Sequence, residues 1–508
     1  MGENVNREIC LTIQANRQDP QSNFTAHGYG WREEMITKIN KAIVSDTPTS
    51  KLRSSEENLK ISIPPDAFLK AYEKSYCPEK LTIGPLYANL RIDSRFDDCK
   101  AVCVKQFMER HGKSDVEDLI KHLIPDPNDL NNHYSNLSQD CIEAFQLLVT
   151  VDTIFIHEYL LFFSSACSKS QRPKERYYLR TCSSTKVICD QEPIGTTHYL
   201  HNFFNNDRTY NQIWRDLFLM GNQIPMLYLT KLIEDFASQL DVKSGRLGKA
   251  LFDIVMTNSP FSIVRPKKDQ IAGIHLLDCQ YSLFTQPKLD DTWWTNQGAG
   301  TLTSNHRDRL PTASQLSKVG IRVKACEGNV SVIKYHPTKF QLDLPRIVVH
   351  NGTEDVLRNL LAYEQTSKAG GEFTMYAVIM DSLIDTQEDL AILTKARVIE
   401  NHLGDDKKLV KMWNKLCTNI TVRSCQRWDE MTRDVLEHYR SPWRPLYVEF
   451  REKFFSRPWL TASVTTAILL VVLTLLQTIY TILSTKRTLD HRAPKQSSVE
   501  RLSSIIGD

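Results

Sequence analysis

The chain has 508 residues, enough for about three average domains or two large ones. Hydrophobic residues make up 41% and charged residues 24% of the chain, and the low Gly and Pro contents exclude collagen-like and low-complexity architectures. The 63 Lys and Arg against 60 Asp and Glu leave a net charge of +3, which excludes a nucleic-acid binder that relies on one large basic face.

The first 58 residues are polar and differ in composition from the rest of the chain. One short helical candidate lies at residues 32–44, and residues 45–58, rich in Ser, Thr, Pro and charge, are typical of a linker. We therefore predict a partly disordered segment over residues 1–58, followed by a globular body over residues 59–455.

The body begins with a predicted helix at residues 67–76 and a strand at Leu81-Thr-Ile-Gly-Pro85, closed by a turn. Apolar residues at helical spacing predict four further helices, over residues 99–111, 116–123, 141–163 and 211–240. Pro225 should kink or divide the last of these. Several prolines and Gly298-Ala-Gly300 predict an irregular insertion at residues 241–310, which would separate two halves, residues 59–240 and 311–440.

The second half mixes short strands with helices. We expect strands at residues 321–324, 342–344 and 347–349, and helices at residues 313–316, 354–365, 373–384 and 426–439. Thr386 and Asp389 have the spacing of a capping box. Gly404 is expected to end one helix and Asp405 to begin the next, and breaks are expected at Pro442 and Pro445. The fold class is therefore mainly α, a large helical body with a few short β-strands.

A charge-free segment at residues 460–485 predicts one C-terminal transmembrane helix, followed by a short polar tail at residues 486–508. About 20 apolar residues suffice to cross a hydrocarbon core, and half of this segment is Leu, Ile or Val. Anchoring residues flank it, as is typical at headgroup depth: Arg457, Trp459, Lys486 and Arg487.

The orientation of this span decides which partners the body can reach. No apolar signal-peptide region is visible in the first 30 residues, which favours a tail anchor with the body in the cytosol, at the plasma membrane or an endomembrane. If the body were lumenal instead, five Asn-x-Ser/Thr sequons could carry N-glycans, at Asn23, Asn136, Asn329, Asn351 and Asn419.

Patterns of catalytic and metal-binding residues are incomplete in this chain. There is no Gly-x-Ser-x-Gly elbow and no phosphate-binding loop. His157-Glu158 begins like a zinc-protease motif, but Leu161 stands where the second His ligand belongs. His198 and His201 with Cys182 and Cys189 also lack the paired spacing of a zinc site. We expect no catalytic, cofactor or metal residues, and reduced, partly buried thiols for the twelve cysteines.

Eight collinear stretches resemble the plant domain of unknown function 247 family, also called uncharacterised plant protein family 0481. They are Glu73-Lys-Ser-Tyr-Cys-Pro78 with Leu81-Thr-Ile-Gly-Pro85, Val151-Asp-Thr-Ile-Phe-Ile-His-Glu158, Asp216-Leu-Phe-Leu-Met-Gly-Asn-Gln-Ile-Pro225, Ala313-Ser-Gln-Leu with Val319-Gly-Ile-Arg-Val323, Leu357-Arg-Asn-Leu-Leu-Ala-Tyr-Glu-Gln365, Met380-Asp-Ser-Leu-Ile384, Val398-Ile-Glu-Asn-His-Leu-Gly-Asp405, and Arg457-Pro-Trp459 before Leu476-Gln-Thr-Ile-Tyr480. The chain departs from the family at Gly221, usually Glu, and at His157, usually apolar.

The resemblance implies a membrane-associated plant protein with a mainly helical body and one C-terminal span, but no assigned activity. Some grass members of the family are linked to pollen self-incompatibility. The shared residues also have a structural explanation, because Gly84 and Pro225 punctuate elements and Asn222, Gln223 and Gln365 can satisfy buried backbone groups.

We expect a single-pass membrane protein that recognises or signals to another protein, with pollen self-incompatibility as the more specific form of this expectation. We expect neither an enzyme nor a nucleic-acid binder. Two alternatives remain open. One is an enzyme of unrecognised type whose acidic and histidine residues meet only in the fold. The other is a membrane scaffold in which the span dimerises, although the span has no Gly-x-x-x-Gly motif.

Overall fold

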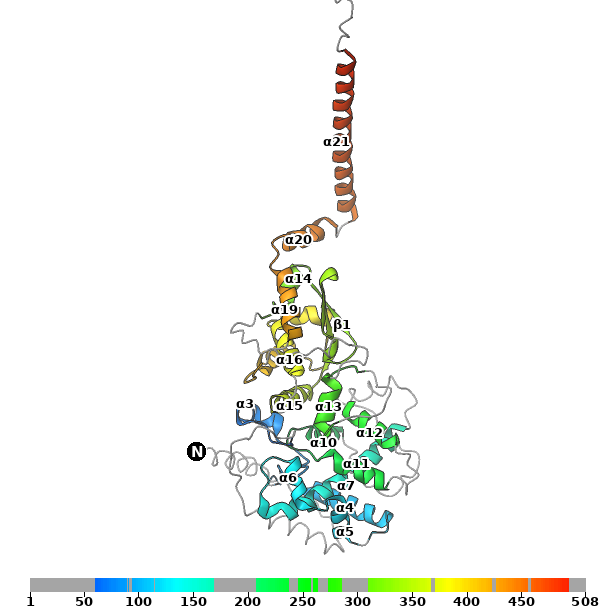
Figure 1. Ribbon diagram of the computed structural model, residues 1–508, viewed down its shortest axis with the longest axis vertical. Helices are drawn as coiled ribbons and strands as arrows, with labels where there is room; N and C mark the ends of the chain where they lie inside the picture. Colours follow the sequence, from blue (N-terminus) through cyan, green and yellow to red (C-terminus); the bar gives the residue numbers. More distant parts are fainter. Residues whose placement is uncertain are drawn as a thin grey trace, which may run out of the picture. The chain divides into compact units, whose positions relative to one another are not determined.

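Helices form most of the structure, as the apolar spacing predicts (Figure 1). The computed structural model describes residues 60–492 except for 89, 91–93, 114, 169–206, 237–244, 257–258, 264–272, 286–308, 367–370, 423–425 and 456–457. The helix and linker predicted within residues 1–58 lie outside the described residues. The described chain divides into two compact units, one of residues up to Leu436 without 317–320, and one of residues 317–320 with those from Glu437 onward.

The longest helix of the first unit, α7 (Ile142–Ser168), forms the centre of its N-terminal part. Its side chains Val149, Ile154, Phe155 and Tyr159 are fully buried. Helices α4, α5, α11 and α12 pack around it. The helices of this part are α3 (Asp66–Tyr76), α4 (Ser94–Arg110), α5 (Val116–Leu123), α6 (Leu130–His133), α10 (Asp207–Leu217), α11 (Met226–Phe236), α12 (Gly245–Met256) and α13 (Leu276–Thr285). Pro225 separates α10 from α11, as predicted.

Two small sheets lie in the later part of this unit. Strand β3 (Gln341–Pro345) pairs in parallel with β1 (Arg322–Cys326) and antiparallel with β2 (Lys334–His336). Strand β4 (Ile347–Val349) pairs in parallel with β5 (Ile399–Asn401). The helices here are α14 (Ala313–Lys318), α15 (Thr353–Thr366), α16 (Glu372–Leu383), α17 (Gln387–Lys395), α18 (Asp406–Leu416) and α19 (Gln426–Tyr439).

The prediction of irregular chain over residues 241–310 is wrong in two places, because α12 and α13 lie there. Pro260 and Pro266 fall between the two helices, so they do not interrupt either. The apolar side chains Phe252 and Val255 of α12 are buried, and they lie three positions apart as a helix face requires. The division of the body into two halves remains a prediction.

A second correction concerns Gly404, which does not end a helix. Helix α17 ends earlier, at Lys395, and Val398 then joins β4 through the hydrogen bond from the Ile347 N–H to its carbonyl at 2.8 Å. Gly404, with φ of +72°, turns the chain from β5 into α18. The capping box of Thr386 and Asp389 and the N-cap at Asp405 are both confirmed.

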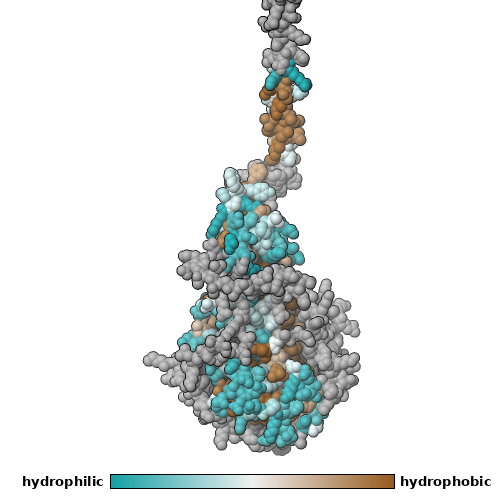
Figure 2. Space-filling view, in the orientation of Figure 1, coloured by the Kyte–Doolittle hydropathy of each residue, from teal (hydrophilic) through white to brown (hydrophobic). Residues whose placement is uncertain are grey.

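The second unit contains α20 (Trp443–Phe455) and α21 (Pro458–Arg492). The break predicted at Pro442 is confirmed, since this residue lies between α19 and α20. The break predicted at Pro445 is wrong, because Pro445 lies within the first turn of α20, where a helix does not need the missing N–H. Residues Ala462–Arg487 of α21 form a candidate membrane span, and no residue in the most apolar part of this segment is buried. Figure 2 shows this segment as an apolar band.

Candidate functional site

Residues 79–84, which overlap the strand predicted at residues 81–85, are held by side chains instead of a neighbouring strand. The buried carboxylate of Asp216 accepts hydrogen bonds from the backbone N–H groups of Lys80 at 2.7 Å and Leu81 at 2.9 Å. The Glu79 N–H lies 3.1 Å from both of its oxygens. Burial raises the pKa of Asp216 to about 6, although Arg215 and these N–H groups favour its ionised form.

Asn222 also bonds the backbone of this segment in the way that a neighbouring strand would. Its Oδ1 accepts the N–H of Ile83 at 2.6 Å, and its Nδ2 donates to the carbonyl of Leu81 at 2.9 Å. One amide side chain thus serves both a donor and an acceptor of the same extended segment, as a ladder would. The prediction of a strand at residues 81–85 is therefore wrong, because these side chains satisfy the backbone without a sheet.

Helices α7 and α4 hold the end of this segment. Asp152 of α7 accepts the N–H of Gly84 at 2.8 Å and pairs with Lys100 of α4 at 2.5 Å. Lys100 also donates to the carbonyl of Thr82 at 2.6 Å. Burial raises the pKa of Asp152, with Lys100 opposing the shift. We call residues 79–84 with Lys100, Asp152, Asp216 and Asn222 the polar junction.

The turn at Gly84 strongly favours glycine over any residue with a Cβ. Its φ is +70°, and a Cβ there would lie 2.5 Å from the backbone oxygen of Gln223. That oxygen accepts a hydrogen bond from the Tyr134 hydroxyl at 3.0 Å, so it is not free to move. Gly221, one of the departures from the family pattern, has φ of +83° and lies close to Tyr87 and Ile63.

A further network joins the polar junction to α3 and α15. Arg215 lies 2.8 Å from Asp216 and 2.7 Å from Asp355 of α15. Asn359, one turn further along α15, accepts the N–H of Met220 at 2.8 Å and donates to the carbonyl of Ser75 at 2.8 Å. Four of the stretches that carry the family resemblance therefore meet here, although they are far apart in the sequence.

His157 and Glu158, the incomplete zinc-protease pattern, are buried and paired within the body. Burial alone would raise the pKa of Glu158, but hydrogen bonds and charge from His157 at 3.1 Å and Arg110 at 2.6 Å hold it below its ordinary value. In the described part of the chain, no three His, Cys, Asp or Glu side chains are grouped so that they could hold a metal ion. His198, His201, Cys182 and Cys189 lie outside the described residues. Among the described cysteines, Cys99, Cys103 and Cys279 are buried free thiols.

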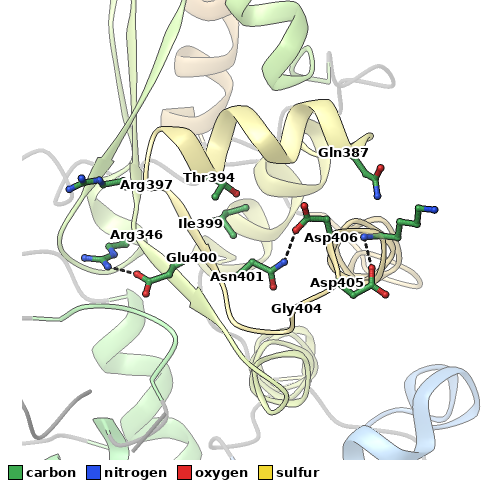
Figure 3. A pocket seen from close by; sticks show the side chains of 11 residues that line it. Arg346, Gln387, Thr394, Arg397, Ile399, Glu400, Asn401, Gly404, Asp405 and Asp406 are labelled. Carbon is green, nitrogen blue, oxygen red and sulfur yellow. Dashed lines mark hydrogen bonds and ion pairs between the residues drawn. The ribbon is translucent and has the colours of Figure 1, made fainter. Parts of the chain in front are cut away.

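A surface cavity of about 900 Å³ lies around β5 and the ends of α17 and α18 (Figure 3). On one side, Glu400 forms an ion pair with Arg346 and a hydrogen bond with His402 at 2.8 Å, and the hydrogen bonds from these two side chains lower the pKa of Glu400. On the other side, Asn401 donates to Asp406 at 2.7 Å. Arg397, with φ of +60°, is exposed at the lining. These side chains can bind a polar surface by charge and hydrogen bonding.

The sequon residues differ in accessibility. Asn136, Asn351 and Asn419 are exposed, whereas Asn329 is buried, with its side chain bonded to the Leu283 carbonyl and the Ser331 N–H at 3.0 Å each. Asn23 lies outside the described residues.

Among the predicted anchors, Trp459, Lys486 and Arg487 are exposed, and Arg457 lies outside the described residues. The glycosylation and anchoring roles remain predictions.

Sequence reasoning found part of the polar junction and missed the rest. The backbone-satisfying role proposed for Asn222 and Gln223 is confirmed, since Gln223 donates to the carbonyls of Leu217 and Leu219. The roles of Lys100, Asp216 and Asp355 were not predicted. One available signal is Asp216 itself, a charged residue that directly precedes the apolar run Leu-Phe-Leu-Met.

Comparisons with known proteins agree with the motifs. The model of the domain of unknown function 247 family, described as plant protein of unknown function, matches residues 61–473. A protein of the uncharacterised family 0481 from Arabidopsis thaliana is 31% identical over 170 residues, which are 33% of this chain and 32% of that protein. The match thus spans about a third of the relative's length. No solved structure matches the chain.

Proposed function

Because the chain belongs to the plant domain of unknown function 247 family, we propose that the family motifs build a body that recognises another protein, and that α21 holds this body at a membrane. The observation that carries the proposal is the polar junction. Its carboxylates and amide are engaged by backbone groups and by Lys100 and Arg215. Side chains used in this way support the body and are not available to a substrate.

The membrane part of the proposal rests on α21. The window Ala462–Arg487 has a mean hydropathy of 2.2 and exposes its side chains on every face. In water such a helix would present a large apolar surface, whereas a bilayer would accommodate it. We propose the plasma membrane or an endomembrane, with the body in the cytosol.

The cavity at β5 is the surface that we propose for partner binding. Its exposed cations, Arg397 and Lys407, lie beside several polar groups that can accept or donate hydrogen bonds. The test compares the full-length wild type with an Arg397→Asp/Lys407→Asp variant, purified from plant membranes in mild detergent. Lys411→Asp is the matched control, because Lys411 is exposed on α18 outside the cavity.

We expect one or more proteins to copurify with the wild type and with the control, and to be lost from the double variant. Identical partners in all three preparations would show that these proteins bind at a surface other than the cavity at β5. The absence of any reproducible partner in several tissues would contradict the recognition function itself.

A more specific form of the proposal is recognition in pollen self-incompatibility, which rests on the family resemblance. It predicts expression in pollen or stigma and sequence polymorphism among mating types. Transcripts found only in vegetative tissue would contradict the role in pollen self-incompatibility. The general proposal, that the body recognises another protein, would not be affected.

A further inference from the structure

Helix α20 exposes four large apolar side chains along one face. Their exposed fractions are 76% for Trp443, 60% for Leu446, 58% for Tyr447 and 46% for Phe450. The spacing of three, four and seven residues from Trp443 places all four on one side of the helix. We call these four side chains the α20 face.

The opposite side of α20 packs against protein. Val448 is only 7% exposed, and its Cγ2 lies 2.8 Å from the position that a Cβ on Gly320 would occupy. At about 100° per residue, Val448 is about 150° around the helix from the centre of the α20 face. The helix therefore has one side that packs against Gly320 and a separate, exposed apolar side.

The chain places α20 directly beside the candidate span. Helix α20 ends at Phe455 and α21 begins at Pro458. Three Cα steps of 3.8 Å join these two residues, so they are at most about 11 Å apart. Because the thirteen residues of α20 extend for about 20 Å, the whole helix remains within reach of the membrane surface that α21 enters.

We propose that α20 is an interfacial helix that lies on the membrane with the α20 face at the boundary between headgroups and acyl chains. The inference rests on the proposed membrane anchor. Trp and Tyr favour this depth because their rings combine apolar area with one polar atom. Leu446 and Phe450 add apolar area to the same contact, as in other helices that lie in the interface plane. The ligand of this face is the lipid surface itself.

Photo-crosslinking of the purified full-length chain, reconstituted in vesicles of phosphatidylcholine and phosphatidylserine, tests the proposal. The photoreactive residue p-benzoylphenylalanine replaces Tyr447 on the α20 face in one protein. In the matched control it replaces Glu449, which is exposed on α20 about 160° around the helix from Tyr447 and about 110° from the centre of the α20 face. A third protein carries it in place of Leu473 within α21, as a reporter of the anchor alone.

We expect lipid adducts from position 447 at about ten times the yield from position 449, because only one face of an interfacial helix enters the lipid. Adducts from position 447 to a second copy of the chain, or no lipid adducts there, would overturn the inference. If position 473 forms lipid adducts and position 447 does not, the interfacial helix is wrong and the anchor stands. If position 473 forms none, the anchor itself is wrong.

Discussion

Two helices of the described chain, α7 and α21, are long and apolar enough to cross a membrane, with mean hydropathies of 1.4 and 2.2 in their most apolar windows. Their surroundings differ, because 72% of the α7 window is buried in the body and none of the α21 window is. The apolar run of α7 contains Asp152, His157 and Glu158, each with a partner inside the body. Residues 460–485 contain no charged residue.

The comparison shows how the two environments select different sequences. A buried carboxylate is tolerated in α7 because Lys100 or Arg110 accompanies it on a neighbouring helix. A helix surrounded by lipid has no such neighbour, so a charge there has to be absent or at the ends. Length and hydropathy alone therefore do not separate the two helices, whereas the partners of their polar residues do.

The largest expected effect comes from removing a partner of α7. Lys100→Met leaves Asp152 uncompensated in the core, and we expect it to cost about 3–5 kcal/mol of the free energy of unfolding. The double variant Lys100→Met/Asp152→Asn should recover most of this loss, because no buried charge remains and the amide oxygen can still accept the Gly84 N–H. Chemical denaturation of the full chain in mild detergent measures both values.

Lys105→Met is the control for this experiment, since Lys105 is a half-buried residue of α4 with 44% of its side chain accessible. It should change the stability by less than about 0.5 kcal/mol. Equal losses for Lys100→Met and Lys105→Met would show that α7 does not depend on the pair.

The converse change places a charge in α21. Leu475→Arg, near the middle of the candidate span, should disfavour membrane insertion by about 2.5–3.5 kcal/mol and leave the stability of the body unchanged. The readout is the fraction of protein that stays with membranes after alkaline carbonate, compared with Leu475→Ala. Full retention of the Arg variant would argue against a helix surrounded by lipid.

Acidification should change the stability of the body but not the membrane retention of α21. The body contains groups that titrate at acidic pH, whereas residues 460–485 contain no acidic, basic or histidine residue. Burial lowers the pKa of His275 to about 4, with the nearby Asp278 opposing the shift. The unfolded chain binds this proton more tightly, so stability should rise as pH increases from about 4 to about 6.5 and be complete above that range.

The titration of His275 alone changes the free energy of unfolding by up to about 3 kcal/mol. His275→Asn removes the titration and keeps an acceptor for the Asp278 N–H, which His275 now binds at 3.1 Å. The stability of the wild type relative to this variant should therefore fall on acidification, while membrane retention stays constant. A difference that does not change with pH would contradict the assignment to His275.

The smallest expected effect concerns the turn that Asp152 of α7 holds. Gly84→Ala should cost about 2–3 kcal/mol, because its φ is positive and its Cβ would press on a backbone oxygen. Gly112→Ala is the matched control, with φ of +61° and no atom within 4 Å of the added carbon. It should cost only about 1 kcal/mol. Thermal unfolding of the two variants side by side gives the difference, and equal losses would show that the contact with Gln223 is unimportant.

Local patterns were enough to predict the helices α5 and α7, the division at Pro225 and the capping box at Thr386, because each depends on residues within a turn or two. The polar junction could not be predicted in full, since Glu79 and Asp216 are 137 positions apart and no periodicity links them. Strand β5 was missed for the same reason, because its partner β4 lies about fifty residues earlier.

Membrane flotation of two chains tests the central claim, that α21 spans a membrane while α7 belongs to the body. One is the full-length protein, and the other ends at Ser441 and so keeps α7 but lacks both α20 and α21. After a carbonate wash, we predict that the full-length chain rises with the membranes and that the shortened chain stays behind as soluble protein. Flotation of the shortened chain, or release of the full-length one, would contradict the account.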